Sequence, residues 1–330
     1  MNILFFGRYD PAYSRNHVLL KGLRSRGVSV AECRIDPSAR WWTLRLLWRY
    51  FRRRQSFDAM IVAFPGQEAI LLARLLTRRP IVFDAFTSHY EGYVLDRQKV
   101  RPGGFRARWY RWLDRTACRL ADAVLTDTDA HTDYFIRESG LDRSMFHRIF
   151  VGTDTDMFMP AGPAPEGQFR VHFHGTNIPL QGVSYILQAQ ELLRGKGVTF
   201  SLIGIDRPRV PYDQLGREMA RAHACLGIFG DTVKTQRVIP NKIFEALAVG
   251  RPVISADTPA IRELLDDDSA MLIPTANPHA LADAILKLKN DSALRSRIGQ
   301  AGRATLLHRA TPDILGRQVV QVIERLSPYP

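Results

Sequence analysis

The chain has little that would cross-link it or carry it through a membrane. Its 330 residues include only three cysteines, Cys33, Cys118 and Cys225, which are far apart. An odd number at such spacing argues against a disulfide framework and against paired-cysteine metal or redox sites. Glycine, proline or a charge interrupts every apolar run before the about 18 residues that a spanning helix needs, and no basic flank precedes the first apolar stretch. We therefore expect a cytoplasmic protein with reduced thiols and neither a spanning helix nor a signal peptide.

Acidic side chains are also fewer than basic ones. Lys and Arg number 46 against 33 Asp and Glu, a net charge of +13, and residues 40–115 alone hold 16 basic and 6 acidic side chains. One surface is therefore expected to be cationic, which would attract nucleic acid, an anionic bilayer or a phosphorylated substrate. No nucleic-acid recognition motif accompanies the charge, which argues against nucleic acid as a partner.

A Gly-x-Gly-x-x-Gly turn is missing both after the first apolar run, residues 2–6, and after His174. That turn lets a backbone approach the pyrophosphate of a dinucleotide. A nicotinamide-dependent dehydrogenase is therefore set aside.

Short apolar runs alternate with helical patterns along the whole chain, which predicts α/β folding with parallel sheets covered on both faces. Strands are expected at residues 2–6, 28–33, 59–63, 81–83, 123–125, 146–150, 171–174, 199–203, 224–228, 252–255 and 270–273. Helices are expected near residues 15–26, 40–54, 67–77, 104–120, 128–139, 182–195, 212–221, 241–249, 259–266, 278–289 and 291–307.

The segment PAGPAPEG at residues 160–167 breaks this periodicity, as a linker does. We therefore predict two Rossmann-like, doubly wound domains, residues 1–160 and 161–311, with residues 312–330 as a final helix returning toward the first domain. Open α/β domains bind ligands at the carboxyl ends of their strands, so the ligand is expected in a central cleft between the two.

The segment VIPNKIFEALAVGRPVI at residues 238–254 predicts a helix that begins after Pro240, ends at Gly250 and leads into a buried strand. The free N–H groups and the positive dipole end at its start form a diphosphate site, which Lys242 would reinforce. Glu245 lies one turn further on the face of Asn241 and Lys242, where a carboxylate can accept both hydroxyls of a ribose. The alternative is an ordinary surface helix with a Glu and Lys pair.

This segment, with the residues that follow it to 288, resembles the donor-domain signature of family 4 retaining glycosyltransferases of the GT-B architecture. HGTNIPLQGVSYILQAQELL at residues 174–193 resembles that family's phosphate loop, and ADAVLTDTDAH (121–131) and VGTDTDMF (151–158) resemble the segments that close its first domain. The resemblance implies an acceptor-binding N-terminal domain, a donor-binding C-terminal domain, and retaining transfer of a sugar from a nucleotide-sugar with no metal and no cofactor. It also implies a front-face substitution in which the departing phosphate oxygen takes the acceptor proton.

The chain departs from the family pattern at three donor positions. Arg237 stands where the family places the first Glu of a pair whose second member matches Glu245, and Thr176 and Gln181 stand where the phosphate loop commonly has Arg and Lys. The diphosphate would then be met by Lys242, Arg237, the helix end and the amides of the loop that begins at Gly175. These departures leave base and sugar undecided and keep a catalytically inactive binding protein as an alternative.

On the acceptor side, Asp84 directly follows an expected strand and His89 lies in the next loop, where the family carries a catalytic histidine. Either residue is a candidate to orient the acceptor or stabilise the transition state, and a turn cap with an exposed histidine is the alternative. Gly7 and Arg15, in and just after the first strand-to-helix loop, are further candidate contacts of the nucleotide-sugar, or parts of a plain turn.

Two Asp-Thr-Asp strings, beginning at Asp127 and Asp154, resemble the metal site of another glycosyltransferase architecture. The first reads as a helix-capping segment and the second precedes the linker, and neither has a third ligand. No metal site is predicted.

The segment RWWTLRLLWRYFRRR at residues 40–54 places an apolar arc, which includes Trp48 and Phe51, opposite an arc of arginines. We expect the apolar arc to pack on the sheet, and Trp42, Arg45, Arg49 and Arg53 to face an anionic membrane, with a solvated helix face as the alternative. RPGGFRARWYRWLDR at residues 101–115 repeats the composition.

The sequence thus predicts a membrane-associating, retaining glycosyltransferase that uses a UDP- or GDP-sugar and a glycan or lipid-linked acceptor. An epimerase, a small-molecule glycosyltransferase and an inactive sugar-nucleotide or glycan-binding protein remain alternatives.

Overall fold

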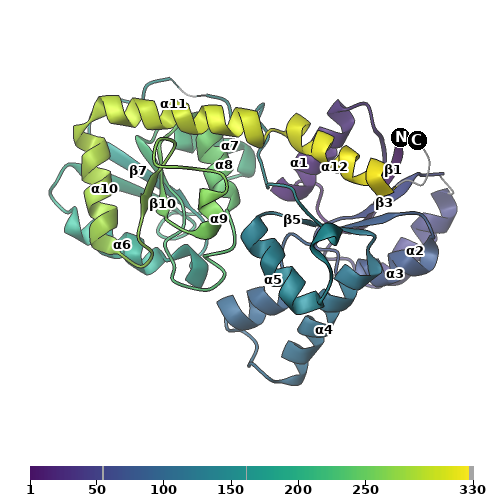
Figure 1. Ribbon diagram of the computed structural model, residues 1–330. Coiled ribbons are helices and arrows are strands. Elements are labelled where there is room, and N and C mark those ends of the chain that lie inside the picture. Colours follow the sequence, from purple (N-terminus) through teal and green to yellow (C-terminus); the bar gives the residue numbers. More distant parts are fainter. Residues whose placement is uncertain (54–55, 161, 327–330) are drawn as a thin grey trace. The chain divides into compact units, whose positions relative to one another are not determined.

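The computed structural model describes residues 1–53, 56–160 and 162–326, in two compact units (Figure 1). Unit 1 is formed by Met1–Val151 together with the chain from Pro312 onward, and unit 2 by Gly152–Thr311. Each unit is an α/β body around its own parallel sheet. The expected Rossmann-like fold class is confirmed, and the expected strands and helices are present with ends shifted by a few residues.

Unit 1 holds a six-stranded parallel sheet in the order β2-β1-β3-β4-β5-β6. Its central strands are short and apolar on both faces, which is why helices cover both sides. The strands are β1 (Asn2–Arg8), β2 (Ser29–Ile35), β3 (Ala59–Val62), β4 (Ile81–Asp84), β5 (Ala123–Thr126) and β6 (Phe146–Arg148). The helices are α1 (Ser14–Ser25), α2 (Trp42–Arg53), α3 (Ala69–Leu76), α4 (Phe105–Leu120), α5 (Asp129–Ser139) and α12 (Pro312–Leu326), with a π-helix at Glu91–Asp96 and a 3-10 turn at Arg143–Met145.

Helix α12 packs against α1, so the end of the described chain belongs to unit 1 (Figure 1). The two backbones touch where Gly22 meets Pro312 and Gly316, and a Cβ at either glycine would clash with the opposite main chain. Small residues at this crossing therefore let the helices approach closely enough to bury Leu315 and Val319.

Unit 2 holds a five-stranded parallel sheet in the order β11-β10-β9-β7-β8. Its strands are β7 (Phe169–His174), β8 (Val198–Ile203), β9 (Ala224–Leu226), β10 (Val253–Ala256) and β11 (Met271–Ile273). Its helices are α6 (Val183–Leu192), α7 (Tyr212–Ala220), α8 (Asn241–Val249), α9 (Pro259–Arg262), α10 (Pro278–Asn290) and α11 (Ser292–Arg309), with a 3-10 turn at Pro179–Gln181.

The boundary between the units falls earlier than the proline-rich linker that the sequence suggested. Residues from Gly152 onward belong to unit 2. Within this stretch, Phe158 is fully buried and its ring packs edge-on against the Tyr212 ring, with 5.3 Å between the ring centres. The segment from Gly162 to Gly167 has no regular secondary structure.

Both sheets reverse their strand order at one place, beside the first strand of each unit. In unit 1 the reversal lies between β1 and β3, and in unit 2 between β7 and β9. The loops that leave two such neighbouring strands run to opposite faces and leave a crevice at the carboxyl edge, which is where open α/β sheets bind ligands. A ligand of either unit is therefore expected at that edge. Among the described residues, no helix is long and apolar enough to cross a membrane.

Candidate active site

The crevice of unit 2 brings together the loop after β7 and the start of α8. Gly175 follows β7, and a Cβ built on it would clash with the Gln181 side chain and lie 2.9 Å from the Lys242 Nζ. The absence of a side chain at Gly175 is what lets Lys242 and Gln181 meet over the loop. Three of the expected phosphate-contact residues are thus neighbours.

Lys242 is buried, although it carries the charge expected to meet a diphosphate. Its Nζ donates to Gln181 Oε1 at 2.9 Å and lies 3.7 Å from the centre of the Phe173 ring. Burial lowers its pKa to about 7, and the Glu245 carboxylate only partly opposes that shift. A bound anion would favour the ammonium form, so the group is set to gain a proton when a phosphate arrives.

Helix α8 has no side-chain cap, and its first residue, Asn241, follows the extended Pro240. Its N-terminal N–H groups therefore carry the partial positive charge that attracts a phosphate. From Lys242 to Val249 the helix is buried, so the alternative of an ordinary surface helix is wrong. Thr176 and Arg237 are half-buried, Thr176 in the loop after β7 and Arg237 ahead of α8.

Glu245 is only 1% exposed, and its carboxylate already has protein partners. Tyr212 Oη donates to Oε1 at 2.8 Å, and His174 Nε2 lies 2.9 Å from Oε2. His174 Nδ1 lies in turn 3.1 Å from Nε2 of His172, whose pKa is lowered well below its usual range by burial and by nearby positive charge. The sequence missed this chain of polar side chains. The sequence feature that could have revealed this chain is the spacing of His172 and His174, two residues apart, which places both on one face of β7.

In unit 1, two expected ligand contacts form a buried structural pair instead. Arg15 and Asp84 are both fully buried, and the Arg15 Nη2 donates to Asp84 Oδ1 at 2.8 Å. The Arg15 Nη1 donates to the carbonyls of Ile149 and Phe150. The guanidinium therefore ties α1 to β4 and to the chain leaving β6. Because neither side chain reaches solvent, a nucleotide-sugar contact by Arg15 and an acceptor contact by Asp84 do not fit the structure.

His89 is placed differently, on the wall of a pocket of about 240 Å³ at the strand reversal of unit 1. Arg8, at the end of β1, and Gln67, after β3, line the same pocket, together with Trp42 of α2. His89 Nδ1 is buried and has no hydrogen-bond partner among the described residues. Gly7, just before Arg8 in β1, has a φ of +142°, a conformation that favours glycine at this strand end.

The loop that carries His89 is held by a buried carboxylate of α4. Asp114 accepts hydrogen bonds from Ser88 Oγ at 2.7 Å and from the backbone N–H groups of His89 at 3.0 Å and Tyr90 at 2.9 Å. Desolvation raises the pKa of Asp114, and these hydrogen bonds oppose that rise. Helix α4, through Asp114, thus holds the backbone at His89 in place.

A second buried charge cluster supports the same loop. His131 lies 2.6 Å from Asp127 Oδ1 and 3.3 Å from Glu91 Oε2, and none of the three side chains is more than 1% exposed. The two carboxylates outweigh desolvation and raise the pKa of His131 to about 9. Thr128 caps α5 by accepting the N–H of His131 at 3.0 Å, which confirms the capping interpretation of this Asp-Thr-Asp string.

The apolar arc that was predicted to pack on the sheet is instead exposed. Trp41, in the turn before α2, is 73% exposed, Trp48 58% and Phe51 61%, whereas Leu46 is fully buried. Trp42 packs on the core beneath the Arg8 guanidinium and lines the pocket, so it is not a surface residue among arginines. Both neighbouring arginines of the expected membrane face, Arg45 and Arg49, are exposed. The side chain of Arg53 lies outside the described part.

Comparison with known proteins agrees with this geometry. A profile described as "Glycosyl transferase 4-like domain" matches residues 4–152, and one described as "Glycosyl transferase-like" matches residues 184–320. The chain belongs to the family 4 glycosyltransferases of GT-B architecture.

Curated relatives of this chain match over parts of their length. A phosphatidyl-myo-inositol mannosyltransferase of Mycobacterium leprae is 34% identical over 86 residues, which cover 26% of this chain and 23% of that protein. An alpha-D-kanosaminyltransferase of Streptomyces kanamyceticus is 25% identical over 224 residues, which cover 58% of this chain and 57% of that protein. The chain thus spans from about a quarter to just over half of these relatives.

Solved structures match over nearly the whole chain. HepE of Anabaena, in complex with UDP and glucose, has a TM-score of 0.72 at 16% identity and covers 98% of this chain and 99% of its own. At that identity the likeness establishes the fold.

Proposed function

We propose that the protein transfers a sugar, with retention of anomeric configuration, from a UDP- or GDP-sugar bound by unit 2 to a glycan or lipid-linked acceptor bound by unit 1. The observation that carries this proposal is the meeting of Lys242, Gln181 and the uncapped start of α8 over Gly175. A buried lysine whose pKa is lowered to about 7, at a helix N-terminus, is suited to a group whose negative charge grows during the reaction. The leaving diphosphate of a nucleotide-sugar is such a group.

The donor would place its diphosphate on this crevice. Lys242, the α8 N–H groups and the loop from Gly175 to Gln181 would neutralise it, with Thr176, Arg237 and Asn241 as the neighbouring polar groups. Glu245 would accept the ribose hydroxyls on lone pairs that the Tyr212 hydroxyl does not use, since that hydroxyl donates its proton to Oε1.

Transfer would follow the front-face course that the family resemblance implies. The bond from the anomeric carbon to the diphosphate oxygen breaks, the acceptor oxygen bonds to the same face, and the departing phosphate oxygen takes the acceptor proton. No strong base in the protein is required. Lys242 and the helix end stabilise the charge on the leaving group, and such fixed donors are worth about 10²–10³ in rate.

The acceptor is proposed to enter the pocket of unit 1. Its walls offer the imidazole of His89, the Arg8 guanidinium and the aromatic face of Trp42, a combination suited to a sugar or a polar headgroup beside an apolar surface. His89, fixed by Asp114 from behind, is the candidate to orient the acceptor hydroxyl.

We further propose that α2 and the turn before it bind an anionic membrane through an exposed ridge, defined as Trp41 of that turn and Leu44, Trp48 and Phe51 of the helix. The arginines Arg45, Arg49 and Arg52 are exposed on the same helix. Aromatic and aliphatic side chains would insert between lipid headgroups, and each arginine near the surface would add about 1 kcal/mol. This geometry supports a lipid-linked acceptor delivered next to the pocket that Trp42 lines.

The vesicle test compares matched exposed sites. Trp48→Glu with Phe51→Glu should abolish flotation of the protein with anionic vesicles, whereas Leu75→Glu, at an 85% exposed position of α3, should not. Flotation that survives the double change, or that is lost equally with Leu75→Glu, contradicts the membrane proposal.

A panel of nucleotides and nucleotide-sugars tests the catalytic proposal. A ligand at about 100 times its Kd adds about 2.7 kcal/mol to stability, so a thermal-shift screen identifies the base. Incubation of the stabilising sugar-nucleotide with glycan and lipid acceptors should then yield an α- or β-linked product of unchanged anomeric configuration. Inverted product would contradict retention, an epimerised donor would indicate the epimerase alternative, and binding without turnover would indicate an inactive binding protein.

A further inference from the structure

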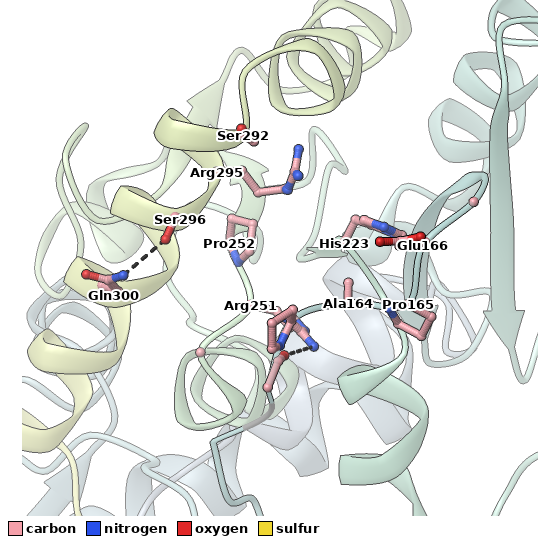
Figure 2. Close-up of a pocket in the computed structure, with 14 residues that line it drawn as sticks. Ala164, Pro165, Glu166, His223, Arg251, Pro252, Ser292, Arg295, Ser296 and Gln300 are labelled. Carbon is pink, nitrogen blue, oxygen red and sulfur yellow. Dashed lines mark hydrogen bonds between the residues drawn. The ribbon is translucent and has the colours of Figure 1, made fainter.

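Unit 2 contains a second polar cavity, of about 560 Å³, at the edge of its sheet opposite the donor crevice. It lies beside His223, which precedes β9, and Pro252, which precedes β10 (Figure 2). The donor crevice, by contrast, follows the end of β7. Because the strands are parallel, these two edges are separated by the full length of the sheet. The cavity is therefore a separate site.

One wall is the segment from Gly162 to Gly167, and two side chains of the sheet edge hold it there. The Arg251 Nη2 donates to the carbonyl of Gly162 at 2.8 Å, and it also bonds the carbonyl of Ala220. His223 accepts the Arg170 N–H on Nδ1 at 3.0 Å, which leaves the proton of the neutral ring on Nε2, and the ring also contacts the Pro165 backbone. Contacts with the body of unit 2 thus hold this wall in place.

The opposite wall is the first part of α11. Figure 2 shows the Arg295 side chain extending from this helix toward the side of the cavity where His223 and Glu166 lie. Arg295 packs over the Phe169 ring, 5.6 Å from its centre, and its Nη1 donates to the carbonyl of Leu288 at 2.6 Å. These contacts fix the guanidinium while its remaining N–H groups keep no partner among the described residues. The hydroxyls of Ser292 and Ser296 line the same wall.

The cavity has an unsatisfied donor and a positive field. Arg251 is 8% exposed, and its Nε is buried without a hydrogen-bond partner in the described chain. Burying such a donor costs about 1–3 kcal/mol unless a ligand or water accepts it. Burial is the main cause that lowers the pKa of His223, and the charges of Arg295, Arg251 and Arg170 lower it further. Glu166 is the one acidic residue among those that line the cavity.

We propose that this cavity binds a phosphoryl dianion, free or as part of a phosphorylated small molecule, between Arg295 and Arg251. Two guanidinium groups on facing walls offer the planar donor pairs that match phosphate oxygens, and the two serine hydroxyls of α11 add neutral donors. The volume leaves room for an organic group beyond the phosphate. Occupancy would tie the segment from Gly162 to Gly167 to α11.

Hydrogen exchange read by mass spectrometry, with inorganic phosphate as the probe, tests the proposal and localises binding. Phosphate should slow exchange in peptides covering residues 162–168 and 292–300, and chloride at equal ionic strength should not. Arg295→Gln should weaken this protection at least tenfold in phosphate concentration. Arg297→Gln is the matched control, since Arg297 lies on the same helix and pairs with Asp268.

Protection centred on these two peptides and lost in Arg295→Gln supports the site. Absence of protection, equal protection by chloride, or an unchanged phosphate dependence in Arg295→Gln overturns it. The Arg295 variant is preferred to one at Arg251, because Arg251 is buried and ties Gly162 to the body of the domain, whereas Arg295 is only half-buried. Protection at residues 174–182 reports phosphate in the donor crevice and is scored separately.

Discussion

The buried Lys242 predicts that nucleoside diphosphates bind with a distinct pH dependence. Its pKa is about 7 in the free protein because burial disfavours the ammonium. A diphosphate beside Nζ restores the preference for the charged form and raises the pKa in the complex. Below pH 7 the lysine is already charged and affinity is at its maximum. Above pH 7 each pH unit removes about tenfold in affinity, until the pH reaches the pKa of the complex.

From pH 7 to pH 9 the expected loss is therefore up to about 50-fold, or about 2.3 kcal/mol, because half of the lysine is already neutral at pH 7. Isothermal titration calorimetry with UDP or GDP, in two buffers of different ionisation enthalpy, measures both the Kd and the proton uptake. Uptake of roughly half a proton or more per nucleotide is expected at pH 7.5. Lys242→Met should abolish uptake and flatten the profile, and Lys289→Met, a change on α10, should leave both unchanged. A flat profile in the wild type, or the same slope in Lys242→Met, refutes the reasoning.

Three further changes probe other parts of the account. Glu245→Ala should weaken UDP or GDP binding by about 1.5–3 kcal/mol, since a charged acceptor of the ribose hydroxyls is lost; an unchanged Kd in a folded variant would exclude that role. His89→Ala should lower the transfer rate while leaving the nucleotide Kd unchanged, and a changed Kd with normal transfer would count against an acceptor-side role. His131→Gln should reduce the free energy of unfolding by about 3–5 kcal/mol, because it leaves the buried carboxylates of Asp127 and Glu91 unpaired. The pKa of His131 is higher in the folded than in the unfolded protein, so its contribution to the free energy of unfolding is complete below about pH 6.5 and is lost as the pH rises to about 9. Denaturant titrations of the wild type, but not of the variant, should show that decline. Identical pH profiles for the two proteins would contradict this role of His131.

The secondary structure was predictable because buried parallel strands are short apolar runs bounded by polar turns. The segments at Ile81–Asp84 and Val253–Ala256 are examples in which all four residues are buried. The start of α8 was predictable for a similar local reason, since Pro240 and Gly250 mark its two ends.

What the sequence could not provide was the direction in which an amphipathic segment faces. The two arcs of α2 were identified from the sequence. In the structure, however, Leu46 and Trp42 pack on the core, and Trp48 and Phe51 are exposed. A helical wheel gives the angle between residues and not the position of the sheet.

The sequence also could not predict hydrogen-bonded or charged pairs between residues that are far apart in the chain. Arg15 and Asp84 are separated by 69 positions, and each alone resembles a ligand contact. Only the fold shows that they satisfy each other. The hydrogen bond from Tyr212 to Glu245 joins α7 to α8 across 33 positions, and no local pattern announces it.

The most direct test of the central claim is single-turnover release of nucleoside diphosphate from the sugar-nucleotide that stabilises the protein, with and without acceptor. We predict release by the wild type, accelerated by acceptor. In Lys242→Ala at saturating donor the rate should be about 10²–10³ lower, because the lost charge acts mainly on the departing diphosphate. A Lys242→Ala protein that turns over at the wild-type rate once saturated with donor would contradict this prediction.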